Sequence, residues 1–310
     1  MAITAAMVKD LREATGAGMM DCKKALTATD GDKEKAVEWL REKGLATAQK
    51  KAGRIAAEGI SMALVSEDGK KAVAVEVNSE TDFVAKNEKF QAYVKQVAEQ
   101  ALDTTAADID AFLAEKSIFD AEKTVADMNS AQIAVIGENL KIRRFARVAA
   151  DNGFVTSYTH MGGKIVVLVE VEADECTPEL TEMAKNVAMQ AAAMRPEYCT
   201  RAEVSAEYLE KEKEVLFAAA KNEKPNAPDK VINGIVNGRL NKELSEVVLM
   251  DQVYVKAEDG KQSVQKYVDS VAKAAGTKAQ VKSFVRFETG EGIEKKQEDF
   301  AAEVAAQVKG

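Results

Sequence analysis

The chain has 310 residues, enough for two or three domains, and is 46% hydrophobic and 30% charged, an ordinary balance for a soluble globular protein. Its formal net charge of −8 argues against direct nucleic-acid binding, because a general nucleic-acid binder needs a basic surface to displace counterions. No stretch reaches the roughly 18 apolar residues of a membrane span, and Lys9, Asp10 and Arg12 interrupt any apolar core of a secretory signal. The three cysteines are far apart and form no CxxC pair, so we expect a reduced, cytoplasmic protein.

The first part of the chain predicts three short helices and a linker. Apolar residues recur at helical spacing over residues 3–11 and 20–28, and a third helix begins after Asp32, which can cap it. Gly44 follows this third pattern and is predicted to end the helix. The alanine- and lysine-rich segment 46–57 has no clear apolar stripe, and we interpret it as a helical linker.

The middle of the chain contains one unit twice. Residues 59–77 align without a gap on residues 153–171, at an offset of 94 residues. Each copy predicts a β-hairpin with a glycine turn, followed by a helix. A third strand closes each unit, at 142–148 in the first copy and 281–287 in the second. Identical pairs include Gly59 with Gly153, Glu76 with Glu170, and Val77 with Val171.

The two copies differ between the second strand and the helix. The helical residues 94–101 match residues 184–191 at an offset of 90, so the first copy holds four extra residues there, in the region of 81–84. This polar segment carries one large aromatic residue, Phe83. One interpretation folds Phe83 back onto its own sheet; the other makes it an anchor for a pocket on a partner protein.

The second copy has an insertion of its own. Its span from hairpin to third strand is longer by 45 residues, and the excess fits residues 204–248. Two helices around residues 224–229 predict an antiparallel helical hairpin that protrudes from the unit. One helix presents Ile232, Val236, Leu240 and Leu244 on a single face, and the other is predicted to oppose it with Val204, Tyr208, Val215 and Ala219.

These elements predict an α+β fold. It consists of an N-terminal three-helix module like a ubiquitin-associated domain, a duplicated core of two three-stranded antiparallel sheets with helices, a helical-hairpin (coiled-coil) protrusion and a C-terminal helix. We place the module and linker at 1–55, the first core unit at 56–151, and the second at 152–292 with the protrusion at about 200–248. The C-terminal helix is expected at 293–310, with Phe300, Val304 and Val308 on its apolar side.

The sequence offers no catalytic constellation. Its single histidine, His160, lies near the tip of the second hairpin, with no nucleophile pattern around it. One histidine and three scattered cysteines do not make a zinc site. Gly16-Ala-Gly18 suggests a phosphate-binding loop, but Asp21 occupies the third glycine position and no strand precedes it. We therefore expect neither an enzyme nor a protein with a metal or cofactor of its own.

Two long motifs resemble a known family. The opening run 3–26 (ITAAMVKDLREATGAGMMDCKKAL) and the run 76–86 (EVNSETDFVAK) are similar to the two signatures of the bacterial elongation factor Ts family. Residues 136–139, 287–292 and 299–304 fit the same family, so the resemblance covers essentially the whole chain in order.

The resemblance implies a guanine nucleotide exchange factor of protein biosynthesis. Such a factor binds the GDP form of elongation factor Tu, displaces Mg²⁺ and promotes exchange of GDP for GTP. The residues implied to intrude beside the Mg²⁺ site are Thr81, Asp82, Phe83 and Val84. The N-terminal module is implied to hold the GTPase domain through Arg12, Met19 and Met20. His160 would contact the partner's third domain, and the C-terminal helix would return to the GTPase domain.

Alternatives of other classes remain at this point. A helical adaptor could bind a peptide or a ubiquitin-like partner through residues 1–45, which leaves the duplicated core without a purpose. A small-molecule enzyme could use the cleft between the core units, although the sequence offers no catalytic constellation. The protrusion is compatible with a homodimer or with a solvated hairpin.

Overall fold

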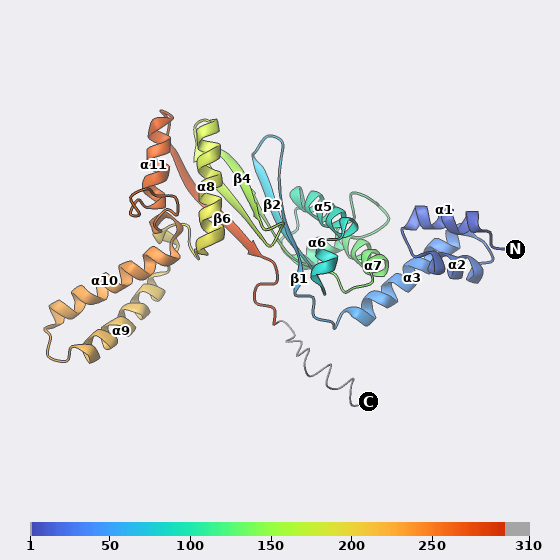
Figure 1. Cartoon of the computed structure of the whole chain (residues 1–310), viewed down its shortest axis with the longest axis horizontal. Coiled ribbons are helices and arrows are strands. Elements are labelled where there is room, and N and C mark those ends of the chain that lie inside the picture. The colour runs from blue at the N-terminus through green and yellow to red at the C-terminus, as the bar shows by residue number, and fades with distance from the viewer. Residues whose placement is uncertain (1, 295–310) are drawn as a thin grey trace. The chain divides into compact units, whose positions relative to one another are not determined.

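The computed structural model describes residues 2–294, and the contacts divide them into two compact units. The first unit comprises the described residues up to Met62, the segment Val75–Phe145 and the segment from Glu288 onward. The second comprises Ala63–Ala74 and Ala146–Phe287. Figure 1 labels the helices and strands of both. The expected C-terminal helix lies, beyond Glu294, outside the described residues.

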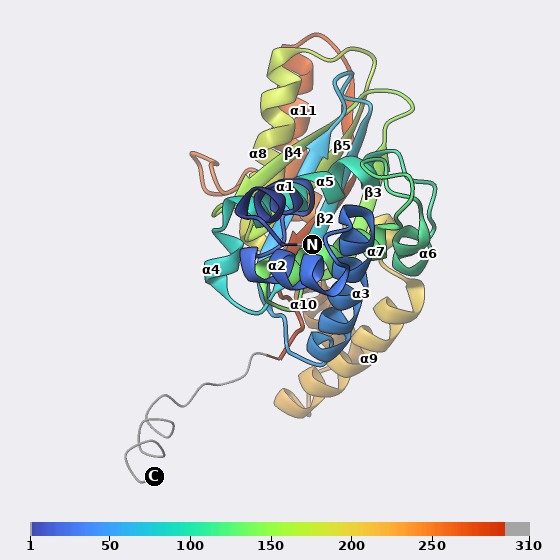
Figure 2. The same cartoon turned by 90° about the vertical axis from the view of Figure 1, so that its right-hand side faces the viewer.

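Three helices form the N-terminal module, as predicted. They are α1 (Ala5–Thr15), α2 (Met19–Ala28) and α3 (Lys33–Lys51). The Thr4 and Asp32 side chains cap α1 and α3 by accepting hydrogen bonds from backbone N–H groups that have no partner inside the helix. Figure 2 faces this module and shows its helices packed around one another. Their small core consists of Val8, Leu11, Cys22, Ala25, Leu26 and Ala36.

Gly44 does not end the third helix, so that prediction was wrong. Helix α3 continues through Gly44 to Lys51 and packs against α7 (Val125–Ile136). Gly44 is buried in this contact; a Cβ atom there would lie 3.6 Å from the Cβ of Ala134 and 3.8 Å from the carbonyl oxygen of Ser130. The glycine therefore lies in a helix–helix contact, and the predicted linker is helical as far as Lys51.

The variant Gly44→Ala is expected to stabilise the protein by about 0.5–1 kcal/mol. Alanine has the higher helix propensity, and its methyl group would meet α7 at ordinary van der Waals distances. Urea unfolding would measure the change, with Gly234→Ala as a control because that glycine, inside a helix of the protrusion, has no neighbour within 4 Å of the added carbon. A loss of stability confined to Gly44→Ala would show that the contact cannot accept a methyl group.

The duplicated core is confirmed as two three-stranded antiparallel sheets. Their orders are β1-β2-β3 and β4-β5-β6. The strands are β1 (Glu58–Val65), β2 (Lys71–Ser79), β3 (Lys141–Ala149), β4 (Phe154–His160), β5 (Ile165–Ala173) and β6 (Ala279–Glu288). In the second hairpin Phe154 lies opposite Val171, and His160 lies opposite Ile165.

One identical pair in the repeat has a steric reason. Gly59 and Gly153 adopt φ values of +125° and +113°, which side chains rarely tolerate. A Cβ atom at Gly59 would collide with the carbonyl oxygen of Val77, and one at Gly153 would collide with that of Val171. Both hairpins therefore bring the backbones of their two strands too close for any residue but glycine.

A helix follows each hairpin, and further helices complete the units. In the first copy they are α4 (Asp82–Ala85), α5 (Glu88–Leu102), α6 (Ile109–Ala114) and α7. In the second copy α8 (Pro178–Met194) and α11 (Val264–Ala274) lie side by side along the β4-β5-β6 sheet (Figures 1 and 2). Their core includes Val167, Val169, Leu180, Met183, Val187 and Val268.

The predicted protrusion is a helical hairpin. Its helices α9 (Ala206–Glu223) and α10 (Asp229–Val247) run side by side in Figure 1 and are flanked by short 3-10 turns, η1 (Arg201–Glu203) and η2 (Leu249–Asp251). The predicted face of α10 is confirmed, because its buried residues are Ile232, Val236, Leu240 and Leu244.

The face predicted to oppose α10 is confirmed at Val204 and Tyr208 and was wrong by one residue at Val215 and Ala219. Val215 is 56% exposed, whereas Leu216, Phe217 and Ala220 pack against α10. Three consecutive apolar residues at 215–217 leave the helical period ambiguous in the sequence, and contact with the partner helix decides which of them turns inward.

The observed packing face of α9 suggests a matched pair of variants. Leu216→Ala is expected to destabilise the hairpin by roughly 2 kcal/mol, because it removes a packed side chain. Val215→Ala is expected to cost under about 0.5 kcal/mol, as exposed substitutions do. Circular dichroism during thermal unfolding would compare them, and equal losses would contradict the observed register.

Candidate functional site

The four extra residues of the first copy form a separate helical turn. Eight residues, 80–87, separate β2 from α5, whereas four residues, 174–177, separate β5 from α8. The difference is filled by α4, whose N-cap is Thr81. The Thr81 hydroxyl accepts a hydrogen bond from the N–H of Val84 at 3.4 Å. We call Thr81–Val84 the Phe83 turn.

Phe83 points away from the protein. Its side chain is 80% exposed, while Ala85, the last residue of α4, is buried. The interpretation that folds Phe83 onto its own sheet is therefore wrong. Leaving a phenylalanine in water forgoes roughly 1.5–3 kcal/mol of burial free energy, and an exposed aromatic ring is the type of side chain that can anchor a protein interface. The neighbouring Asp82 and Lys86 form an ion pair at 2.7 Å on the surface of the turn.

A carboxylate from another part of the chain holds the start of the Phe83 turn. Glu138 follows α7, and one of its carboxylate oxygens accepts hydrogen bonds from the backbone N–H groups of Glu80 and Thr81, both at 3.0 Å. Its other oxygen accepts a hydrogen bond from the Thr81 hydroxyl at 2.6 Å. Three donors from two adjacent residues thus converge on one side chain.

Hydrogen bonds run in both directions between residues 80–81 and residues 138–139, and the end of α3 takes part in the same network. The Glu80 carboxylate accepts a hydrogen bond from the Asn139 N–H at 2.6 Å and lies 3.5 Å from the Arg54 guanidinium. The Asn139 side chain donates to the Arg54 carbonyl at 2.8 Å, and Lys51 donates to the Gly137 carbonyl. The sequence-based site did not include Glu80, Glu138 or Asn139. Their only signals were the matches to the family of residues 76–86, which include Glu80, and of residues 136–139.

A buried carboxylate supports the strand that precedes the turn. Glu76 on β2 is fully buried and accepts hydrogen bonds from Arg143, Arg144, Asn78 and the N–H of Gly290 at 2.6–3.0 Å. Burial by itself raises the pKa of the Glu76 carboxyl, but the hydrogen bonds from Gly290, Asn78 and Arg143 and the charge of Arg144 outweigh burial and hold the pKa below its usual value. Glu76 is therefore an anion that ties β2 to β3 and to the segment after β6.

The structure brings Arg12, Met19 and Met20 together in one groove, which we call the module groove. The groove has a volume of about 780 Å³, and Met19 and Met20 are 58% and 63% exposed. Exposed methionines make an adaptable apolar contact surface. The groove is lined by Ile3, which precedes α1, by residues of α1 and α2 that include Val8, Lys9, Arg12, Met19 and Met20, and by Lys89 of α5.

His160 lies in the other compact unit, at the end of β4. It is exposed, and its Nδ1 atom lies 3.0 Å from the hydroxyl of Tyr158. Both residues of this contact belong to β4, so His160, at the hairpin tip, has its partner within its own strand. The structure does not bring it together with Phe83 or with the module groove in one unit.

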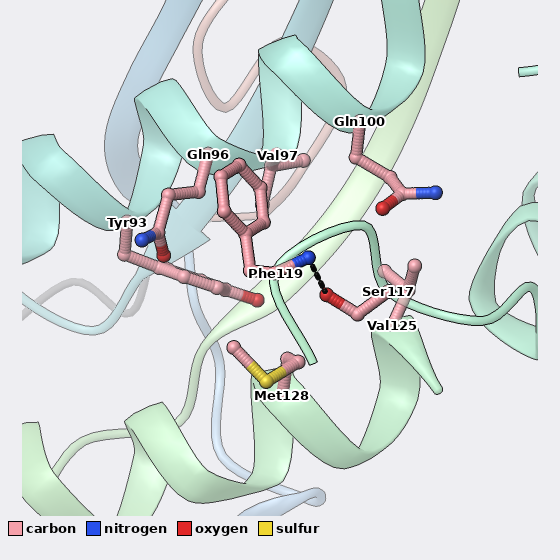
Figure 3. A pocket seen from close by; sticks show the side chains of 8 residues that line it. All are labelled: Tyr93, Gln96, Val97, Gln100, Ser117, Phe119, Val125 and Met128. Atoms are coloured by element: carbon pink, nitrogen blue, oxygen red, sulfur yellow. Dashed lines mark hydrogen bonds between the residues drawn. The ribbon is translucent and has the colours of Figure 1, made fainter. Parts of the chain in front are cut away.

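A pocket between α5 and α7 is too small for a substrate. Figure 3 shows the ring of Phe119 between residues of these helices, including Val97 and Met128. The cavity measures about 20 Å³, which is room for about one water molecule. Among residues 2–294 no cluster of three or more His, Cys, Asp or Glu side chains could hold a metal ion. The same residues contain no helix long and apolar enough to cross a membrane.

Comparison with known proteins identifies the family. The model of the family described as "Elongation factor TS" matches residues 80–291, more than half of the chain. The chain is 52% identical to "Elongation factor Ts" of Trichlorobacter lovleyi over 99% of this chain and 98% of the relative. It is 51% and 52% identical to the proteins of the same name from Clostridium botulinum and Clostridium tetani, over 99% of each chain. The chain therefore belongs to the elongation factor Ts family, as its motifs predicted.

Proposed function

We propose that this protein is a guanine nucleotide exchange factor of translation elongation, acting on the GDP form of elongation factor Tu. The observation that carries the proposal is Phe83, an aromatic side chain that is 80% exposed on a turn present in one copy of the core and absent from the other. Family membership supports the role in elongation. The helical-adaptor alternative leaves this turn without a purpose.

The proposed roles follow the two surfaces of the first unit. The module groove, with Arg12, Met19 and Met20, binds the GTPase domain of the partner. The Phe83 turn then intrudes beside the partner's Mg²⁺, which bridges the protein and the phosphates of GDP. Disturbing that ion removes a large part of the free energy with which the partner binds GDP. His160, in the other unit, is proposed to contact the partner's third domain.

Binding of the exchange factor and binding of GDP to the same GTPase are thermodynamically linked. A factor that binds the nucleotide-free GTPase more tightly than the GDP form must weaken GDP binding by the same ratio. The exposed Phe83 can supply binding energy to the nucleotide-free state, because aromatic anchors dominate many protein interfaces. No covalent bond is made or broken, so the proposed activity is that of an exchange factor and not of an enzyme.

The test is release of a fluorescent GDP analogue from elongation factor Tu, followed by stopped flow. Substoichiometric amounts of this chain are expected to accelerate release of the whole bound pool, because each molecule acts repeatedly. Acceleration limited to one turnover per molecule, or no acceleration, would exclude the proposal.

A further inference from the structure

We infer that Glu138 is the positioning residue of the Phe83 turn, an inference that rests on the proposed exchange activity. Glu138 is 55 residues away from Phe83 in sequence, yet it binds the two residues that precede Asp82. These hydrogen bonds go to Glu80 and Thr81, whereas the exposed side chain of the turn is Phe83. The effect of Glu138 on exchange would therefore pass through the orientation of the turn.

The hydrogen-bond chemistry fixes the orientation of Thr81. An ionised carboxylate can only accept hydrogen bonds, so the Thr81 hydroxyl must donate its proton to Glu138. The lone pairs of the same hydroxyl then face the backbone N–H of Val84 and accept its hydrogen bond. This bond makes Thr81 the N-cap of α4. Glu138 thereby sets the direction of the first turn of α4, and with it the direction in which Phe83 points.

The residue that positions the turn is itself held in place. Asn139, next to Glu138, donates its N–H to Glu80 and its side-chain amide to the carbonyl of Arg54. Lys51 donates to the carbonyl of Gly137, on the other side of Glu138. Lys51 at the end of α3 and Arg54 just after it therefore hold the residues on both sides of Glu138, which supports the backbone from which the carboxylate extends.

Two substitutions separate positioning from mere stability. Glu138→Ala removes all three hydrogen bonds and is expected to lower the maximum rate of GDP release about tenfold, a factor equivalent to about 1.4 kcal/mol. The concentration for half-maximal release is expected to stay within about twofold, because the module groove that is proposed to bind the GTPase domain is unchanged. Glu138→Gln is expected to keep most of the rate. Its oxygen can accept both N–H groups, and its NH₂ group can donate to the Thr81 hydroxyl.

A second readout needs no partner. Hydrogen exchange of the Glu80 and Thr81 amides in the free protein is expected to speed up at least about tenfold in Glu138→Ala, since both lose their acceptor. It should remain near the wild-type rate in Glu138→Gln. Glu138→Asp withdraws the carboxylate by one methylene group and should give an intermediate rate in both assays, which provides the test if the alanine variant does not fold.

The outcomes separate this inference from the proposed function. Unchanged amide exchange in Glu138→Ala would overturn the inference, and so would faster exchange combined with an unchanged maximum rate. A drop in rate that Glu138→Gln does not restore would also overturn it. If the wild-type chain fails to release GDP at all, the proposed function fails, while the amide data still show whether Glu138 holds the turn.

Discussion

Phe83→Ala is expected to slow GDP release from elongation factor Tu by roughly 30-fold to 1,000-fold, which corresponds to about 2–4 kcal/mol of interaction energy. The ring is 80% exposed in the free protein, so its removal leaves no cavity and should not lower the protein's own stability. Stopped-flow release of a fluorescent GDP analogue would measure the rate. Thermal unfolding would confirm that the variant stays folded.

Ile118→Ala is the matched control for this variant. Ile118 belongs to the same compact unit and is 64% exposed, but it lies between α6 and α7, away from the Phe83 turn in the sequence. It is expected to change the release rate by less than about twofold, as surface substitutions outside an interface do. Equal losses in the two variants would mean that general surface hydrophobicity, and not Phe83, carries the effect.

Glu76→Ala is expected to lower the free energy of unfolding by about 3 kcal/mol. It leaves the N–H of Gly290 without its acceptor and removes the carboxylate that pairs with Arg143 and Arg144. Breaking a buried ion pair costs roughly 3–5 kcal/mol. We expect the lower end because the two arginine side chains are 24% and 31% exposed. Urea unfolding at neutral pH would measure the loss.

The repeat supplies the control for this experiment. Glu170 is the equivalent residue in the second copy; it is half-buried and accepts a hydrogen bond from Ser283 at 2.7 Å. Glu170→Ala is expected to cost about 1.5 kcal/mol, the lower end of the range for one hydrogen bond to a charged group, because Glu170 is only half-buried. A larger loss for Glu170→Ala than for Glu76→Ala would contradict the central place given to Glu76.

The same carboxylate gives the stability a pH dependence of defined sign. Because the pKa of Glu76 is lower in the folded protein than its ordinary value of 4.5, its ionised form stabilises the fold above about that pH. This contribution is lost as the pH falls through the folded-state pKa. The stability difference between wild type and Glu76→Gln should therefore shrink as the pH falls below 4.5 and be constant near neutrality. A difference that grows in acid would contradict the assignment of Glu76 as a stabilising anion.

The sequence predicted those features of the fold that depend on local pattern or on internal repetition. The hairpins, their following helices and the four-residue excess before α5 were all visible as alternation, spacing and a change of offset between two copies. Gly44 and Val215 were interpreted wrongly, because in each case contact with a helix from elsewhere in the chain overrides the local signal. Gly44 lies against α7, and the choice between Val215 and Leu216 depends on α10.

The candidate site was predicted only in part for the same reason. Phe83 could be identified because it belongs to a segment that one copy lacks. Glu138 could not, because a carboxylate 57 residues from Thr81 carries no local sign that it will bind that backbone. Side chains that position a functional segment from a distance become visible only when the chain is folded.

The most direct test of the central claim is the Mg²⁺ dependence of the Phe83→Ala defect. If the Phe83 turn acts by disturbing the Mg²⁺ of elongation factor Tu, the defect in GDP release should be large at millimolar Mg²⁺. It should shrink to a few-fold when a chelator has removed the ion, because the turn then has no ion to displace. A defect of the same size in both conditions would contradict the account and would assign Phe83 to binding alone.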